Sequence, residues 1–152
     1  MTKKIYGFLM LAMVLFTTAC KQDPPILPSN LQNAQLIGKW GLTEFSIGTK
    51  VNTDAETLVG PISGTANDFF IFAEGNQAVL SSTIYQKSFA GYYSANSAAS
   101  TLSFKSGELL IKYDVQTVSV TELELSEVVS VVTDQSGNTI TTTNYYTYNR
   151  LP

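Results

Sequence analysis

The chain has no histidine and only one cysteine, Cys20, among its 152 residues. Without histidine it cannot build a histidine-based catalytic triad, a Cys–His dyad or a histidine metal cluster. With one thiol it cannot form an intrachain disulfide. Serine and threonine are plentiful, but no suitable base is placed to activate them as nucleophiles. We therefore expect that the protein is not an enzyme and that it uses no metal and no other cofactor.

Charge is also scarce, because charged residues make up 14% of the chain and the formal net charge is -3. Removing residues 1–19, which hold Lys3 and Lys4 and no acidic residue, brings the net charge to -5. A mildly acidic domain binds nucleic acid poorly, so we expect no nucleic-acid partner. Hydrophobic residues reach 44%, which is typical of a folded chain, and the length suits one domain.

The first twenty residues have the organisation of a bacterial export signal. Two lysines precede the apolar run 5–16, which is too short to span a bilayer as a stable anchor. The small residues 17–19 then precede Cys20 and resemble a lipobox, in which leucine usually stands where this chain has Thr17. A lipobox marks the cysteine whose sulfur receives a diacylglycerol and before which the signal is cut. The resemblance implies a signal peptide over residues 1–19 and a lipid, with acyl chains such as palmitate, on Cys20.

The alternative for Cys20 is an ordinary cleaved signal that is followed by an incidental cysteine. An exported protein with one free, exposed thiol would be open to oxidation, which favours lipidation. Residues 20–35, with three prolines, are predicted to be the lipidated cysteine and an extended tether. Lys21 and the acidic Asp23 resemble the signals that send Bacteroidota lipoproteins to the outer face of the outer membrane. The expected partner is therefore a membrane of the cell envelope, the outer membrane, with the domain facing either the periplasm or the cell surface.

Residues 36–152 have the composition and spacing of β-structure. Val, Ile, Thr, Tyr and Phe fall in short runs separated by Gly, Asn, Asp and Ser, and no long stretch has a clean helical period. The range 51–67, which contains Gly60, Pro61 and Gly64, is predicted to be a long loop with at most a short helical turn. The eight predicted strands cover residues 36–47, 68–73, 77–82, 86–94, 101–105, 108–116, 119–133 and 139–150.

The short connections between these strands predict an antiparallel meander. Several strands alternate cleanly; Ile111 and Tyr113 share one face, and Lys112 and Asp114 share the other. Eight alternating strands suit an all-β fold in which an up-and-down sheet closes into a barrel and so removes its exposed edges. A two-sheet sandwich is the alternative.

Two segments resemble lipocalin-like domains. The Gly38-Lys39-Trp40 segment is similar to their opening strand, and the Tyr148-Asn149-Arg150 segment resembles their closing strand. The resemblance covers residues 36–152 and extends to the lipocalin-like lipoproteins of Bacteroidota. It implies that Trp40 closes one end of an eight-stranded barrel and that Arg150 lies across the indole ring, both in structural roles. The META-type lipoprotein domain is a rival, but its Gly-Cys-Asn segment is absent, and the lysozyme-inhibitor type usually carries a disulfide that this chain cannot form.

Aromatic residues on the inward parity of the strands are the most informative candidates for a site. In an eight-stranded barrel such residues either fill the interior or line a cavity for one small ligand. The cavity alternative predicts a small apolar or amphipathic ligand that enters the barrel at the end opposite Trp40. The loop predicted over the range 51–67 would then cover this open end as a lid. The core alternative predicts a protein-interaction module, such as an inhibitor or accessory subunit of an envelope complex, with a filled barrel. The candidate lining residues are Phe70, Phe72, Tyr93, Phe104, Tyr113 and Tyr146.

Overall fold

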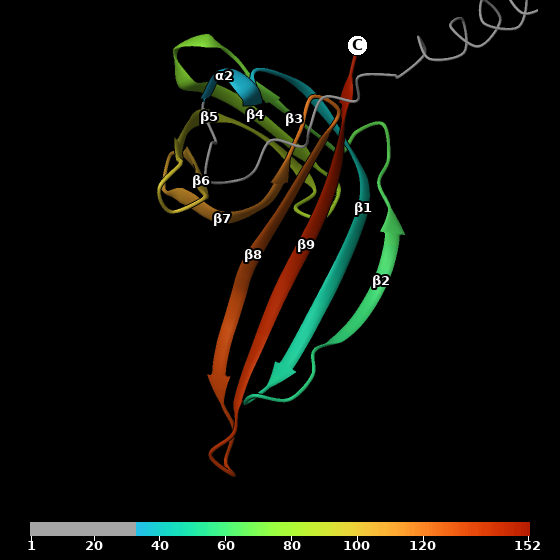
Figure 1. Ribbon diagram of the computed structural model, residues 1–152, viewed down its shortest axis with the longest axis vertical. Coiled ribbons are helices and arrows are strands. Elements are labelled where there is room, and N and C mark those ends of the chain that lie inside the picture. The colour runs from blue at the N-terminus through green and yellow to red at the C-terminus, as the bar shows by residue number, and fades with distance from the viewer. Residues whose placement is uncertain (1–32) are drawn as a thin grey trace, which may run out of the picture.

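A computed structural model describes residues 33–152, which are almost entirely β-structure (Figure 1). The signal peptide, Cys20 and most of the tether predicted from the sequence lie outside the described residues. A short helical turn α2 (Asn33–Leu36) and a turn η3 (Glu74–Asn76) accompany nine strands. The strands are β1 (Gly38–Val51), β2 (Thr57–Ser63), β3 (Phe69–Phe72), β4 (Gln77–Ser82), β5 (Lys87–Asn96), β6 (Thr101–Ser106), β7 (Leu109–Val118), β8 (Glu122–Thr133) and β9 (Thr139–Leu151).

The strands form one antiparallel sheet that closes on itself. Their order is β2-β1-β3-β4-β5-β6-β7-β8-β9, and β1 also pairs with β9 along nearly its whole length. Strands β1 and β3 to β9 therefore make a closed eight-stranded barrel, and β2 is an additional strand beside β1. The predicted eight-stranded antiparallel barrel is confirmed, and the sandwich alternative is wrong.

The prediction of a long loop over the range 51–67 is wrong, because this range contains β2. Thr57 pairs with Thr49 of β1, and Ile62 pairs with Phe45. Leucine, valine and isoleucine favour a strand here, whereas the Gly60-Pro61 pair suggested a loop. Both residues are tolerated because they lie at a register shift of an edge strand, between the Val59–Ile47 and Ile62–Phe45 pairs, where neither residue is part of the ladder with β1. This range therefore extends the sheet and is not a free lid.

The chain enters the barrel through α2, which occupies the end of the predicted tether. Leu36 is fully buried, and its carbonyl oxygen accepts a hydrogen bond of 2.7 Å from Nε1 of Trp40. Leu36 belongs to this helical turn and packs into the end of the barrel. The first strand therefore begins at Gly38, two residues later than the sequence predicts.

Three strands of the barrel continue past it into a second region. The β1–β3 pairing ends at Gly41, and the β7–β8 pairing ends at Ser126, but β1, β8 and β9 remain paired far beyond these points. Together with β2 they form a four-stranded sheet, which we call the blade: residues 46–51, 57–63, 127–133 and 139–145. Figure 1 shows the blade running away from the barrel, with the β8–β9 turn at its tip.

Hydrogen bonds fasten both ends of the blade. At the tip, the Asn52 side chain accepts a bond of 2.8 Å from the Thr139 amide and donates one of 2.9 Å to Asn138 Oδ1. Near the barrel, the buried Asp68 carboxylate accepts bonds from the amides and hydroxyls of Thr65 and Thr83. Asp68 thereby ties the segment that follows β2 to the turn between β4 and β5.

Candidate functional site

The closed end of the barrel is built around Trp40 and Arg150. The indole is fully buried, and the guanidinium carbon of Arg150 lies 4.2 Å from its ring centroid. The guanidinium also donates bonds of 2.7 to 2.8 Å to the carbonyl oxygens of Gln35, Ile37 and Val120. All of its nitrogens are used by the protein itself, so this end is a structural seal and offers no free cation to a ligand.

Gly38 is required at this seal. Its φ of +138° lies in the region that favours glycine, and a Cβ there would sit 2.7 Å from Nη1 of Arg150. The glycine and the tryptophan of the opening Gly-x-Trp segment therefore serve the same contact: one makes room for the guanidinium and the other lies beneath it.

The six candidate lining residues all lie inside the barrel, and their rings pack against one another. Phe70 is central, because its ring centroid lies 4.3 Å from that of Phe72, 5.4 Å from that of Phe104 and 6.2 Å from that of Tyr113. Phe72 also meets Tyr93 at 4.9 Å, and Tyr113 meets Tyr146 at 5.8 Å. Every one of the six side chains is buried. This arrangement is the one that the core alternative describes.

The interior tyrosines are held in their neutral form. Burial raises the pKa of Tyr113 well above its ordinary value, and burial likewise raises the pKa of Tyr146 and Tyr148. Neutral phenols behave here as large apolar side chains with one hydroxyl each.

A polar cluster marks the opposite end of the barrel, where the blade begins. Tyr146 donates a hydrogen bond of 2.8 Å to Oε2 of Glu127, and Tyr85 donates one of 3.0 Å to the same oxygen. Asn144 Nδ2 donates to the Tyr146 hydroxyl at 3.1 Å. Burial, together with the neighbouring Glu127 carboxylate, raises the pKa of Tyr85 to about 12. The cluster therefore presents one carboxylate held by two neutral tyrosines.

Sequence reasoning missed Tyr85 and Glu127 as members of this cluster. Glu127 shares the inward parity of Leu125, and this signal could have placed it inside. Tyr85 lies in the turn between β4 and β5, and it meets Glu127 only because the barrel closes, so the local pattern contains no signal for it.

The blade carries most of the apolar side chains that the domain exposes. Of the twelve large apolar side chains that are exposed in residues 33–152, seven lie on the two outer strands of the blade. The central strands carry threonines instead, at positions 49, 141, 142 and 143. A concentration of exposed apolar residues on one projecting element is typical of an interface. The seven are Leu58, Val59, Ile62, Val128, Val129, Val131 and Val132.

The two outer edges of the blade differ. The free edge of β2 contains Pro61, which has no N–H to donate, and Gly60, whose φ is +123°. The free edge of β8 begins at Glu127, because no strand within residues 33–152 pairs with it on that side beyond Ser126. A register shift interrupts β8 between Val128 and Ser130, and beyond this shift the strand pairs regularly with β9.

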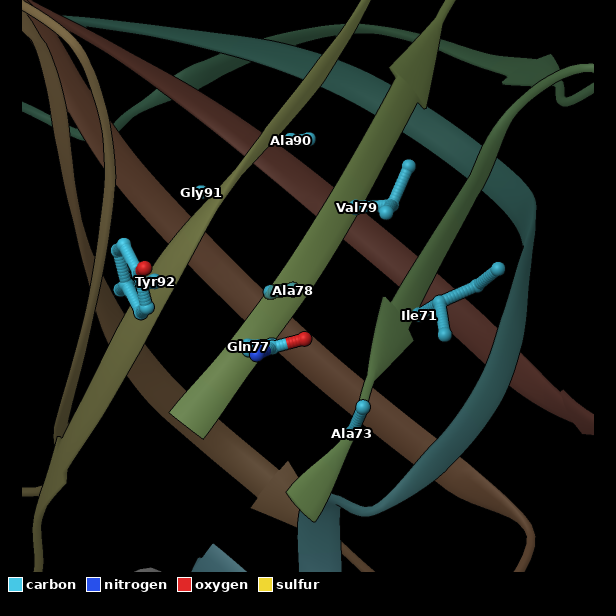
Figure 2. Close-up of a pocket in the computed structure, with 8 residues that line it drawn as sticks. All are labelled: Ile71, Ala73, Gln77, Ala78, Val79, Ala90, Gly91 and Tyr92. Atoms are coloured by element: carbon cyan, nitrogen blue, oxygen red, sulfur yellow. The ribbon is translucent and has the colours of Figure 1, made fainter. Parts of the chain in front are cut away.

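A separate hollow lies on the outside of the barrel over β3, β4 and β5. Its volume is about 360 Å³, and Figure 2 shows it between Tyr92 of β5 and Ile71 of β3. Its walls are aliphatic apart from Tyr92 and Gln77, and none of the six predicted lining residues contributes to it. Gly91 stands where a Cβ would collide with the Lys105 carbonyl, so this glycine permits close packing of β5 on β6. The hollow has few polar groups to orient a ligand.

Within residues 33–152, no three acidic, cysteine or histidine side chains are grouped to hold a metal ion. Among these same residues, no helix has both the length and the apolar character needed to cross a bilayer. No protein-family model matches the chain, and no curated protein matches it with significant similarity.

Proposed function

We propose that the protein is a lipid-anchored interaction module of the cell envelope, in which the barrel is a scaffold and the blade binds a protein partner. The observation that carries the proposal is the concentration of exposed apolar side chains on β2 and on the outer half of β8. Monomeric domains seldom keep such surface in water unless it binds something.

The position of the predicted anchor supports this function. The tether would join the domain at α2, beside the closed end, and β1 runs from there to Val51 near the tip of the blade. A lipid on Cys20 would therefore hold the closed end toward the membrane and direct the blade away from it. The blade would then be the part that is most accessible to another envelope protein.

The packing of the interior also supports an interaction module over a carrier. The six aromatic residues that would line a ligand cavity are in ring contact with one another, so a ligand would have to displace rings from the core. Binding of a small apolar ligand, which the lipocalin-like resemblance implies, stays a prediction. Native mass spectrometry of the purified protein tests it, because a bound molecule adds its mass to that of the chain.

Site-specific photo-crosslinking in cells tests the proposed function. A photoreactive residue is placed at Val128 or Val132 of the blade, which are 53% and 52% exposed. The matched controls are Leu110 and Val120 of the barrel, which are 51% and 55% exposed. We expect discrete protein adducts from the blade positions only. Adducts from all four positions, or from none of them, would contradict the proposal.

A further inference from the structure

Beyond its register shift at residues 128–130, the outer edge of β8 lacks the features that usually protect an edge strand from pairing. Proteins blunt such edges with proline, lysine, bulges or a covering segment. The β2 edge has Gly60 and Pro61, whereas residues 130–133 of β8, beyond the register shift, have neither proline nor charge. These four residues pair in regular register with residues 139–142 of β9, so their backbone is held extended on one side, and on the other side no strand of the described part of the chain pairs with it.

Side chains on both faces of this edge are ready to be covered. Val131 pairs with Thr141 and Val132 pairs with Ile140, so the two valines lie on opposite faces of the blade, and both are exposed. A strand added here would gain main-chain hydrogen bonds and would also bury one valine on each face. The edge thus offers unpaired main-chain groups and exposed apolar side chains, the two contributions that stabilise an added strand.

The charge around the edge indicates the kind of strand that fits. Residues 127–138, which form this edge and the turn after it, carry two acidic residues, Glu127 before the edge and Asp134 beyond it, and no basic residue. A second copy of the chain would bring the same acidic excess to the junction, which disfavours self-pairing. A strand with basic residues beyond its apolar centre would instead complement this charge.

We propose that the partner binds by adding an extended segment to β8 at residues 130–133. The segment has a β-branched, uncharged centre and basic residues at its ends. This inference rests on the proposed function and specifies it further: the partner contributes a strand of its own to the sheet, and the side chains of the blade hold it on both faces.

Peptide binding to the full-length protein in detergent micelles tests the inference. The probe is a fluorescent peptide with an alternating Val-Thr centre and two lysines at each end, measured by fluorescence anisotropy. A second peptide has glutamates in place of the lysines, and a third is methylated at alternate backbone nitrogens, which removes donors and keeps the side chains. We expect the first peptide to bind and the other two to bind at least about tenfold more weakly.

Two variants with matched exposure locate the binding edge. Val131→Lys alters the β8 edge and Ile62→Lys alters the β2 edge, at side chains that are 60% and 58% exposed. We expect Val131→Lys to weaken binding of the first peptide about tenfold and Ile62→Lys to leave it within about twofold. Circular dichroism checks that both variants fold. If one variant does not fold, the comparison of the first and the methylated peptides on the wild-type chain still tests the inference.

Several outcomes would overturn the inference. Equal binding of the methylated peptide would exclude a main-chain ladder, and equal binding of the glutamate peptide would exclude the charge preference. Equal loss in both variants would place docking across the blade rather than at β8. A concentration-dependent dimer in sedimentation velocity that Val131→Lys abolishes would show that a second copy covers the edge. If Val128 and Val132 crosslink to a protein but the peptide does not bind, only the strand-addition inference fails.

Discussion

Inside the barrel, β1, β8 and β9 bury one side-chain face against aromatic rings, whereas in the blade β8 leaves both faces in water and the central strand β9 stays largely half-buried. Leu125 and Tyr146 lie opposite each other in the core, while Val132 lies opposite Ile140 beyond the mouth, where Val132 is exposed. The three strands stay paired with one another in both regions; what changes is that β3 and β7 stop accompanying them and that β2 pairs with β1 instead. In the proposed function, stability and binding are therefore separated along the length of the same strands.

The largest loss of stability should come from the sealed end of the barrel. Trp40→Ala removes a fully buried indole that stacks against the Arg150 guanidinium and donates a hydrogen bond to the Leu36 carbonyl. We expect it to cost about 3–5 kcal/mol in the free energy of unfolding, measured by urea denaturation. A cost below about 1 kcal/mol would show that this end of the barrel does not depend on the indole.

The next effect concerns Asp68, at the junction of the two regions. Burial by itself raises the pKa of Asp68, but the hydrogen bonds from Thr83 and Thr65 outweigh it and hold the pKa below its ordinary value. The stabilisation is therefore present above the unfolded-state pKa of about 3.9 and is lost as the pH falls through the folded-state pKa.

Asp68→Asn should accordingly cost about 1–3 kcal/mol at neutral pH and should flatten the loss of stability in acid. Denaturation curves of the wild type and the variant between pH 7 and pH 3, at about one-unit intervals, measure both effects. If the free energy of unfolding of the variant falls with decreasing pH as steeply as that of the wild type, other carboxylates cause the pH dependence.

A smaller and more local effect is expected at the tip of the blade. Asn52 has a φ of 52°, which glycine adopts freely, so Asn52→Gly removes the side-chain bonds to Asn138 and Thr139 without straining the backbone. We expect faster hydrogen exchange at the amides of the tip, by a factor of about five if the bonds contribute about 1 kcal/mol, with no change in the barrel. Faster exchange throughout the barrel would show that the two regions open together.

The smallest effect should come from an exposed valine. Val131→Thr keeps the side-chain shape and adds a hydroxyl in water, so it should change stability by less than about 0.5 kcal/mol. Val115→Thr is the matched change inside the barrel, where the buried hydroxyl should cost about 1–3 kcal/mol. Equal costs for the two substitutions would contradict the division between a buried core and an exposed blade.

Much of the barrel could be predicted from residue types, because strand alternation and turn residues are local signals. Ile111 and Tyr113 alternate with Lys112, and the structure buries the first two and exposes the third. The turn at residues 74–76 ends one strand and begins the next as the sequence suggests. The six interior aromatics were likewise placed inside by their parity alone.

The blade could not be predicted, because it depends on where neighbouring strands stop. The valines of β8 have the pattern of an ordinary strand, and only the departure of β7 after the Ser126 pair leaves them exposed. β2 was missed because Gly60 and Pro61 are loop signals wherever the pairing partner is unknown. The Glu127–Tyr85 contact joins residues far apart in the chain, so it required the closed barrel.

Under the proposed anchoring, hydrogen exchange of the protein in isolated membranes, compared with the purified protein, tests the central claim most directly. If a partner occupies the blade, the amides of residues 127–133 should exchange more slowly in the membranes, while the barrel amides around Phe70 and Phe104 exchange alike in both samples. Protection confined to the barrel, or identical exchange of the blade in the two samples, would contradict the assignment of the blade as the binding surface.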